Sequence, residues 1–343
     1  MRVSRIVTAA VTLGLVGGMA SLEAAKLHLN PMVDLLANKQ PVFGLYAPSN
    51  PRGGGRAGAP APTTPPPPVK TPAELAQAAL AAPSDFIFDG SMEGGVDRGL
   101  PAFTTMLGAL SENGLLVKTP NPHFSHSIVV KMQEIGKDYP KATEAIGKQL
   151  DAGVTTIMFV GTESAAEVAA GIKAMRYKNK GGTRADSVGN APKIWGLSES
   201  DYKKKADLWP LNKDGELVNW TIVESKEGLA HVREIAAVKG IGVLWPGAGT
   251  LRGVFSDPKI GADGKQEIGP NGRGVTVFNQ DAWEKAIQQV LSACKEFNVP
   301  CGFPSNTPED MEMRYKQGFR VFVASWGDNG TKMVERGREL RKK

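Results

Sequence analysis

Eight short apolar runs, separated by segments with helical spacing, limit what this 343-residue chain can fold into. Each run has three to five residues, is rich in Val, Ile and Phe, and is apolar on both faces. Strands of this kind are typical of a parallel sheet that is buried on both sides. The predicted strands are Val42–Tyr46, Phe86–Phe88, Ile128–Val130, Thr156–Val160, Asn219–Val223, Gly242–Trp245, Cys301–Phe303 and Arg320–Ala324.

The segments between these runs carry the start and stop signals of helices. Thr71 and Ser164 each stand three residues before a glutamate, which is the spacing of a capping box. Thr307 starts another helix, and Gly318 ends it. Two more helices are predicted, one with Trp283, Ile287, Val290, Leu291, Cys294 and Phe297 on its apolar face, and a last one over Thr331 to Leu340.

Eight strand–helix units in about 250 residues match the number of units and the typical length of a (β/α)8 TIM barrel. We therefore predict an α/β fold with a single barrel domain over residues 26–343. A doubly wound open sheet is the alternative, but it needs a glycine-rich turn after its first strand. The glycines at 53–55 precede no immediate helix, so they are weak support for that alternative.

The first 25 residues look like a secretory signal peptide. Arg2 and Arg5 form a basic N-terminal region, and an uncharged apolar run follows over residues 6–20. Gly18 and Ala20 supply the small residues at positions −3 and −1 of a cleavage site. The run is short for a membrane span, although an uncleaved N-terminal anchor is the alternative. The signal predicts a periplasmic or secreted protein with no stable membrane insertion after cleavage.

Two segments interrupt the strand–helix pattern. Residues 50–69 are dominated by Pro, Gly and Ala, which predicts a disordered insertion. Residues 178–216 show no strong periodicity, and we interpret them as an insertion after a strand that covers the site or a subunit contact. Cys294 and Cys301 could pair, but their positions favour two buried thiols.

The charge of the chain argues against a nucleic-acid partner. It has 41 Lys and Arg and 35 Asp and Glu, a net charge of +6, and the basic residues are not gathered into one binding surface. Apolar residues make up 41% and charged residues 22%, the composition of a soluble globular protein. A small molecule is therefore the expected partner.

Functional side chains of a parallel barrel gather at the carboxyl ends of its strands. Asp89 and Glu93 follow the second strand, Lys131 ends the third, and Glu224 directly follows the fifth. Carboxylates and a lysine at one rim favour a hard-cation site with an anionic substrate. Glu224 is the best metal-ligand candidate, because a carboxylate after a buried strand is costly unless it is paired or metal-bound.

Each of these residues also has a structural alternative. Glu224 could form an ion pair with Lys or Arg, Lys131 could pair with a neighbouring carboxylate, and Asp89 could cap the following turn. The turn after the sixth strand could present backbone N–H groups to an anionic substrate, which makes its residues substrate-binding candidates. These residues are Gly247, Ala248 and Gly249.

Five segments of the chain carry motifs that recur together in known enzymes, namely Gln149–Val154, Thr162–Ser164, Ala174–Tyr177, Ile222–Gly228 and Gly240–Leu244. Together they resemble the HpcH/HpaI family of divalent-metal-dependent 2-oxo acid aldolases, such as 4-hydroxy-2-oxoheptanedioate aldolase. The likeness extends from about Asp85 to the C-terminus, and residues 177–216 are similar to an insertion in one branch of the family.

The resemblance implies a (β/α)8 barrel that assembles into hexamers or trimers. In such enzymes a Glu and an Asp hold Mg²⁺, Mn²⁺ or Co²⁺, which acts as a Lewis acid on the substrate. Carried over residue by residue, the metal ligands fall on Glu224 and on Thr250, which stands at the Asp position. The Arg that binds the substrate carboxylate falls on Lys131.

The family motif after the second strand is Asp-x-Glu-His, and here it reads Asp89-Gly90-Ser91-Met92-Glu93, without the His. Asp89 or Glu93 is therefore the candidate for the base or for a second carboxylate ligand. The expected activity is cleavage of a small 4-hydroxy-2-oxo acid to pyruvate and an aldehyde. A small-acid-binding protein without this chemistry, on an aldolase scaffold, is the alternative.

Overall fold

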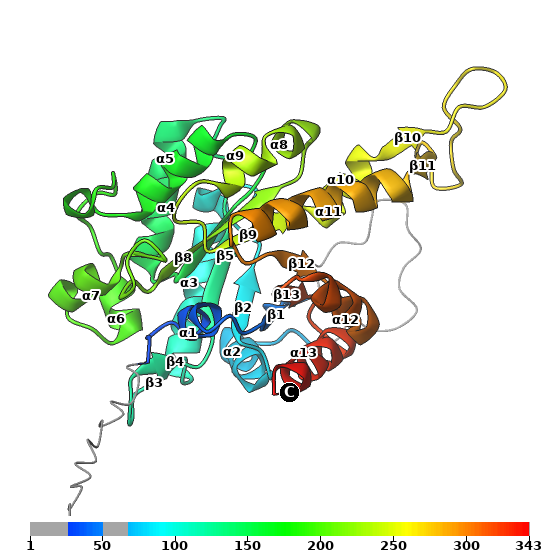
Figure 1. Ribbon diagram of the computed structural model, residues 1–343. Coiled ribbons are helices and arrows are strands. Elements are labelled where there is room, and N and C mark those ends of the chain that lie inside the picture. Colours follow the sequence, from blue (N-terminus) through cyan, green and yellow to red (C-terminus); the bar gives the residue numbers. More distant parts are fainter. Residues whose placement is uncertain (1–26, 51–67, 343) are drawn as a thin grey trace, which may run out of the picture.

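The centre of the molecule is a curled, parallel sheet (Figure 1). The structure, a computed structural model, describes residues 27–50 and 68–342, and each predicted apolar run overlaps one strand of this sheet. The strands are β1 (Val42–Tyr46), β2 (Phe86–Asp89), β5 (Ser127–Lys131), β6 (Thr156–Phe159), β8 (Leu217–Val223), β9 (Val243–Pro246), β12 (Gly302–Pro304) and β13 (Val321–Ala324).

The pairing order is β12-β13-β1-β2-β5-β6-β8-β9, and every pair is parallel. The short β7 (Leu208–Trp209) also pairs with β8. A single parallel bridge joins Leu244 of β9 to Cys301, next to β12, at the place where the ring of a (β/α)8 barrel would close. These eight strands therefore form one continuous parallel sheet, as predicted for an α/β fold. The single Leu244–Cys301 bridge connects its two edges.

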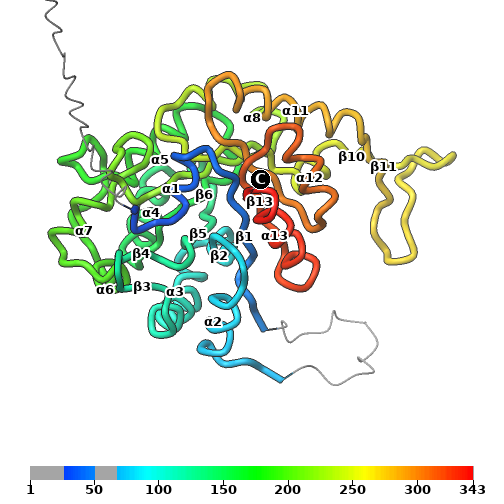
Figure 2. Tube along the Cα trace, turned by 60° about the horizontal axis from the view of Figure 1, so that its bottom comes forward, coloured from blue at the N-terminus to red at the C-terminus, as the bar shows by residue number. Residues whose placement is uncertain are grey.

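Helices surround this sheet on the outside (Figure 2). Thr71 begins α2 with the predicted capping box. Ser164 caps α5 through the N–H of Glu167, but the Glu167 carboxylate accepts from the N–H of Glu163, so this capping box is one-sided. The helices are α2 (Pro72–Ala81), α3 (Val96–Glu112), α4 (Tyr139–Ala152), α5 (Ala165–Met175), α8 (Lys226–Ala230), α9 (Val232–Ala236), α10 (Ala248–Val254), α11 (Gln280–Glu296), α12 (Pro308–Gln317) and α13 (Asp328–Arg341).

Large aromatic side chains fill the interior of the curled sheet. The Trp220 ring lies 5.1 Å from Phe86 and 4.8 Å from Trp245, measured between ring centroids. Helix α1 (Pro31–Ala37) contributes Met32 to this cluster and covers the amino-terminal ends of the strands. Because the interior is packed with side chains, binding chemistry is confined to the ends of the strands.

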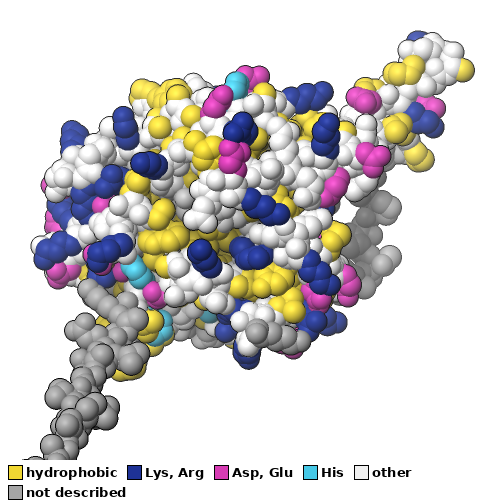
Figure 3. Space-filling model, in the orientation of Figure 1, with side chains coloured by type: hydrophobic (Ala, Val, Ile, Leu, Met, Phe, Trp, Pro, Cys, Tyr) yellow, Lys and Arg dark blue, Asp and Glu magenta, His cyan; other side chains and the backbone are white. Residues whose placement is uncertain are grey.

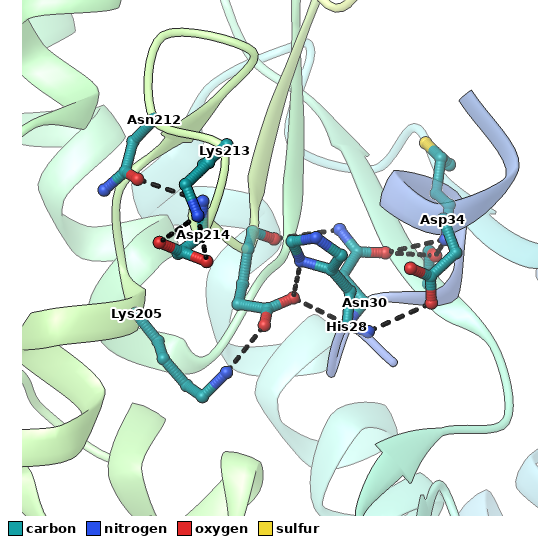
Figure 4. A network of polar contacts seen from close by, with 10 residues as sticks. His28, Asn30, Asp34, Lys205, Asn212, Lys213 and Asp214 are labelled. Atoms are coloured by element: carbon teal, nitrogen blue, oxygen red, sulfur yellow. Dashed lines mark hydrogen bonds and ion pairs between the residues drawn. The ribbon is translucent and has the colours of Figure 1, made fainter. Parts of the chain in front are cut away.

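A polar network joins His28 and Asn30, which precede α1, to Glu216, which directly precedes β8 (Figure 4). The buried Glu216 carboxylate lies 3.3 Å from His28, 2.8 Å from Lys205, and accepts a 3.0 Å hydrogen bond from the Asn30 N–H. Hydrogen bonding to Glu216 raises the pKa of His28. Burial opposes ionisation of Glu216, but the hydrogen bonds from its partners outweigh it and lower its pKa.

The interpretation of residues 178–216 as an insertion covering the site is wrong. The segment follows helix α5 and precedes strand β8, so it lies at the amino-terminal ends of the strands, away from the candidate site. It folds into a short 3₁₀ helix (Lys178–Lys180), α6 (Ala191–Trp195), α7 (Glu199–Lys205) and β7. A subunit contact there stays a prediction.

The expectation of two free thiols is also wrong. Cys294 and Cys301 form a disulfide, with their Cα atoms 5.7 Å apart. Cys294 lies in the last turns of α11 and Cys301 directly before β12, so a short turn folds one back onto the other. The spacing of two cysteines does not reveal this approach, because it depends on how α11 packs against the sheet.

The two predicted N-terminal features lie largely outside the described residues. The signal peptide over residues 1–25 falls entirely outside them, and so do residues 51–67 of the proline-rich insertion. The ends of that insertion are held together, because Asn50 and Lys70 exchange two hydrogen bonds of 2.8 Å each. Within the described ranges, no helix combines the length and the apolar character needed to cross a membrane.

Two short antiparallel ribbons are present that were not among the strands predicted from the sequence. One pairs β3 (Leu116–Val117) with β4 (His123–Phe124). The other pairs β10 (Ser256–Pro258) with β11 (Thr276–Phe278) and projects from the body as an arm (Figure 1). Neither ribbon has the long alternating pattern by which strands are found in a sequence.

Candidate functional site

A cavity of about 1190 Å³ opens at the carboxyl ends of the strands. Its wall is built by the segments that follow β2, β5, β6 and β8, and by the first turn of α10. Three of the predicted site residues line it, namely Glu93, Glu224 and Thr250. The structure therefore brings together side chains from separate strands at the end of the sheet where parallel α/β proteins place their sites.

Glu224 follows β8 and is held in place by two neutral donors. Its Oε1 accepts a 2.9 Å hydrogen bond from the N–H of Gly161, and its Oε2 accepts a 2.7 Å hydrogen bond from the Thr250 hydroxyl. In the described part of the chain, no basic side chain forms an ion pair with Glu224, so the ion-pair alternative is not observed. The carboxylate is thus oriented on the cavity wall by two neutral donors, without an ion-pair partner among the described residues.

Gly247 allows this arrangement by letting the backbone approach Glu224 closely. A Cβ at position 247 would lie only 2.3 Å from the Glu224 Cβ, so any larger residue would displace the carboxylate. The N–H of Gly247 donates to the Val223 carbonyl at 2.8 Å and is not free for an anion. The predicted anion-binding turn loses this donor, and neither Ala248 nor Gly249 lines the cavity.

Lys131 forms an ion pair with Glu93; Glu93 lines the cavity, whereas Lys131 stands behind it and is not among the lining residues. The Lys131 ammonium lies 3.1 Å from both Glu93 carboxylate oxygens. The lysine side chain is 16% exposed and that of Glu93 is 45% exposed. The salt-bridge alternative for Lys131 is therefore observed, and the ammonium can offer a substrate only a hydrogen that this pair leaves free.

Asp89 occupies the end of β2 and caps the turn that follows. Its Oδ1 accepts a 2.7 Å hydrogen bond from the N–H of Ser91. Asp89 does not line the cavity, whereas Glu93 does. Of the two carboxylates proposed as base or second ligand, the structure thus leaves Glu93 as the one that faces the cavity.

Two further side chains support the rim. Gln149 is fully buried and donates a 3.0 Å hydrogen bond to the Lys131 carbonyl, which holds the end of β5 against α4. Tyr46, at the end of β1, packs its ring 4.7 Å from Phe88. Burial raises the pKa of Tyr46, the Lys131 charge opposes the rise, and the Glu93 charge adds to it, so the phenol belongs to the same rim.

Gly161, whose N–H donates to Glu224, is a site residue that the sequence did not predict. A signal was present, because a glycine directly follows the apolar run at Thr156–Val160. Gly161 adopts a positive φ of 57°, a conformation that side-chain-bearing residues rarely take. The glycine thus turns its N–H toward the next strand end, a role that the sequence pattern does not reveal.

The residues present fit a weakly held divalent metal better than a closed metal cage. In residues 27–50 and 68–342 no three His, Cys, Asp or Glu side chains gather as metal ligands. Mg²⁺ commonly binds through one or two carboxylates, with water and substrate oxygens completing its shell. The oxygens of Glu224 and Thr250 on the cavity wall match that minimal donor set.

Comparison with known proteins defines the class of fold. No family model matches the chain. An HpcH/HpaI aldolase/citrate lyase family protein from Burkholderia cenocepacia J2315 superposes with a TM-score of 0.59 and 18% identity, covering 91% of this chain and 98% of the other. An HpcH/HpaI aldolase from Desulfitobacterium hafniense DCB-2 gives 0.56 and 14%, covering 90% and 95%. The fold is that of these family proteins.

A relative found by sequence points the same way. The 2-dehydro-3,6-dideoxy-6-sulfogluconate aldolase of Pseudomonas putida is 26% identical over 194 residues, which are 56% of this chain. The match spans 65% of the length of that aldolase. The resemblance that the motifs predict is therefore confirmed, through structural neighbours of the HpcH/HpaI family and one related aldolase.

Proposed function

We propose that this protein is a metal-dependent carbon–carbon lyase on a closed (β/α)8 barrel, which cleaves a small 4-hydroxy-2-oxo acid into pyruvate and an aldehyde. One observation carries the proposal. Glu224 lies at the carboxyl end of β8, oriented by Gly161 and Thr250, on the wall of a large cavity and without a basic partner in the described chain. The aldolase relative and the family neighbours support the same reaction class.

Glu224, with Thr250 beside it, would hold the metal. When bound, a divalent cation draws electron density from the keto oxygen of a 2-oxo acid. Lys131 binds the substrate carboxylate through an ammonium hydrogen that its pair with Glu93 leaves free. These residues come from three different strand ends, so the closed sheet fixes their separation.

Glu93 is the proposed proton acceptor, since it faces the cavity and no histidine follows it. It takes the proton of the substrate 4-hydroxyl, and the C3–C4 bond breaks as the C4–O bond becomes a carbonyl. The electron pair of the broken bond remains on the pyruvate half. Return of the proton to C3 releases pyruvate and leaves Glu93 ionised.

Location and assembly are proposals of the same kind. The Cys294–Cys301 disulfide supports an exported, periplasmic or secreted protein, because disulfides persist in oxidising compartments. We propose a homo-oligomer, a hexamer or trimer, on the resemblance to the family.

The test is pyruvate release from 4-hydroxy-2-oxo acids in the presence of Mg²⁺, Mn²⁺ or Co²⁺. Glu224→Gln should lower kcat/KM at least 100-fold, because the amide keeps the shape but loses the charge that holds the metal. Glu234→Gln, on the exposed surface of α9, is the matched control and should leave the rate unchanged. Absence of turnover with every metal, by folded protein, would overturn the proposal.

A second candidate is a binding protein for small acids on the same scaffold. It is favoured by the finding that no three potential metal ligands gather among the described residues. A thermal-shift panel of 2-oxo acids separates the two candidates. Stabilisation by an acid that the protein never cleaves would establish binding, whereas turnover would establish the lyase.

A further inference from the structure

A second cavity, of about 850 Å³, lies at the opposite end of the sheet from Glu224. Its walls are the segments that lead into the strands, at residues 36–40, 236–241, 297–301 and 318–320, together with residues 209–211. The Cys294–Cys301 disulfide forms part of its wall. None of the residues considered for the lyase reaction reaches this cavity.

All the charged side chains that line this cavity are basic. They are Lys39, Lys239, Lys295 and Arg320. Within the described ranges none of the four forms an ion pair, although Arg320 donates to the carbonyls of Tyr315 and Phe319. Four cations around one concave site, without a counter-charge in the described chain, make it a place where an anion is electrostatically favoured.

The remainder of the wall is mainly apolar. Trp209, Ile241 and Val299 line it, and at its edge Leu211 and Phe297 are 40% and 36% exposed. Hydrophobic and basic side chains lie interleaved on this face, next to α1 (Figure 3). Apolar surface of this kind, rimmed by charge, is typical of a ligand site rather than of a surface that faces only water.

We propose that this cavity binds an amphipathic anion, a small molecule with a carboxylate or similar acidic head and an apolar tail or ring. The basic rim accounts for the head and the apolar wall for the body of the ligand. The volume of about 850 Å³ lies within the usual range of small-molecule pockets, roughly 300–1000 Å³, which favours one bound small molecule over a membrane surface. The inference is independent of the reaction proposed at Glu224.

Trp209 provides a local probe, because it lines the cavity and bromine quenches indole fluorescence on contact. Titration with 8-bromooctanoate should quench the protein saturably, and Trp209→Phe should remove that quenching. The same tail with a neutral head, 8-bromooctan-1-ol, should bind at least tenfold more weakly. In the double variant Lys239→Glu, Lys295→Glu the carboxylate should bind at least tenfold more weakly, whereas the alcohol should bind as before.

Lys332→Glu, on the exposed surface of α13, is the matched charge control and should leave the titration unchanged. Equal affinity for the acid and the alcohol would show that the cavity recognises only the apolar tail, and this would overturn the proposal. Quenching that persists in Trp209→Phe would also overturn the proposal, and so would an unchanged affinity for the carboxylate in the double variant Lys239→Glu, Lys295→Glu. Flotation with anionic phospholipid vesicles, without binding of the free carboxylate, would assign the surface to a membrane instead.

Discussion

Replacing Thr250 by Asp would place a second carboxylate where the resemblance to the aldolases expects one. The Thr250 hydroxyl lies 2.7 Å from Glu224 Oε2 and donates to it. An aspartate there exchanges this hydrogen bond for a second negative charge close to the first. The variant therefore tests directly whether Glu224 faces a place where a cation can sit.

The repulsion can be estimated from this geometry. Two unit charges about 4 Å apart interact by about 4 kcal/mol at an effective dielectric constant near 20, and solvent at the open rim reduces this to about 2 kcal/mol. Without metal, Thr250→Asp should therefore lower the free energy of unfolding by about 2 kcal/mol relative to Thr250→Asn. A divalent ion at 100 times its Kd restores about 2.7 kcal/mol and should reverse the loss.

Urea unfolding in EDTA and in Mn²⁺ measures both effects, and calorimetric titration measures Mn²⁺ affinity. Thr250→Asp should bind Mn²⁺ at least tenfold more tightly than the wild type, whereas Thr250→Asn, of the same size but neutral, should not. If Thr250→Asp has the same stability in EDTA as Thr250→Asn, or the same Mn²⁺ affinity as the wild type, the reasoning about this rim is refuted.

Three further predictions concern other parts of the molecule. Replacing Cys294 and Cys301 by Ser should lower the free energy of unfolding by about 2.5 kcal/mol, the loop-entropy value for a short loop, and equal stability in urea would contradict it. The pKa of His28 is raised above its ordinary 6.5, so its bond to Glu216 stabilises the fold fully below pH 6.5 and loses this effect as pH rises through the native pKa. His28→Gln should therefore destabilise most at low pH in urea titrations between pH 5.5 and 8.5, and a pH-independent difference would count against the ion pair. Lys131→Met should raise KM for the 2-oxo acid at least tenfold while Lys131→Arg retains most of the affinity, and an unchanged KM for Lys131→Met would remove it from substrate binding.

The strands were predictable because their signal is local. Each apolar run overlaps a strand, and the run at Val42–Tyr46 coincides with β1. The Thr71 capping box and the Gly318 helix end were found for the same reason, since a cap involves residues only three or four positions apart. The short ribbons and the place of residues 178–216 were missed, because they depend on how elements pack.

The candidate site shows the same contrast between features with a local signal in the sequence and features that depend on packing. That Glu93, Lys131 and Glu224 stand at strand ends follows from counting along the chain. That Lys131 pairs with Glu93, and that Glu224 takes its hydrogen bonds from Gly161 and Thr250, follows only from the order of the strands. These partners are 26 to 63 residues apart in the chain.

Neighbouring residues thus specify where each strand and helix starts and stops, and hence which side chains reach the rim. Which of them meet there, and whether Cys294 meets Cys301, is settled by the pairing of strands and the packing of helices. The physical reason is distance along the chain: backbone conformation and capping act over a few residues, whereas contacts in the site join segments that only the folded sheet brings together.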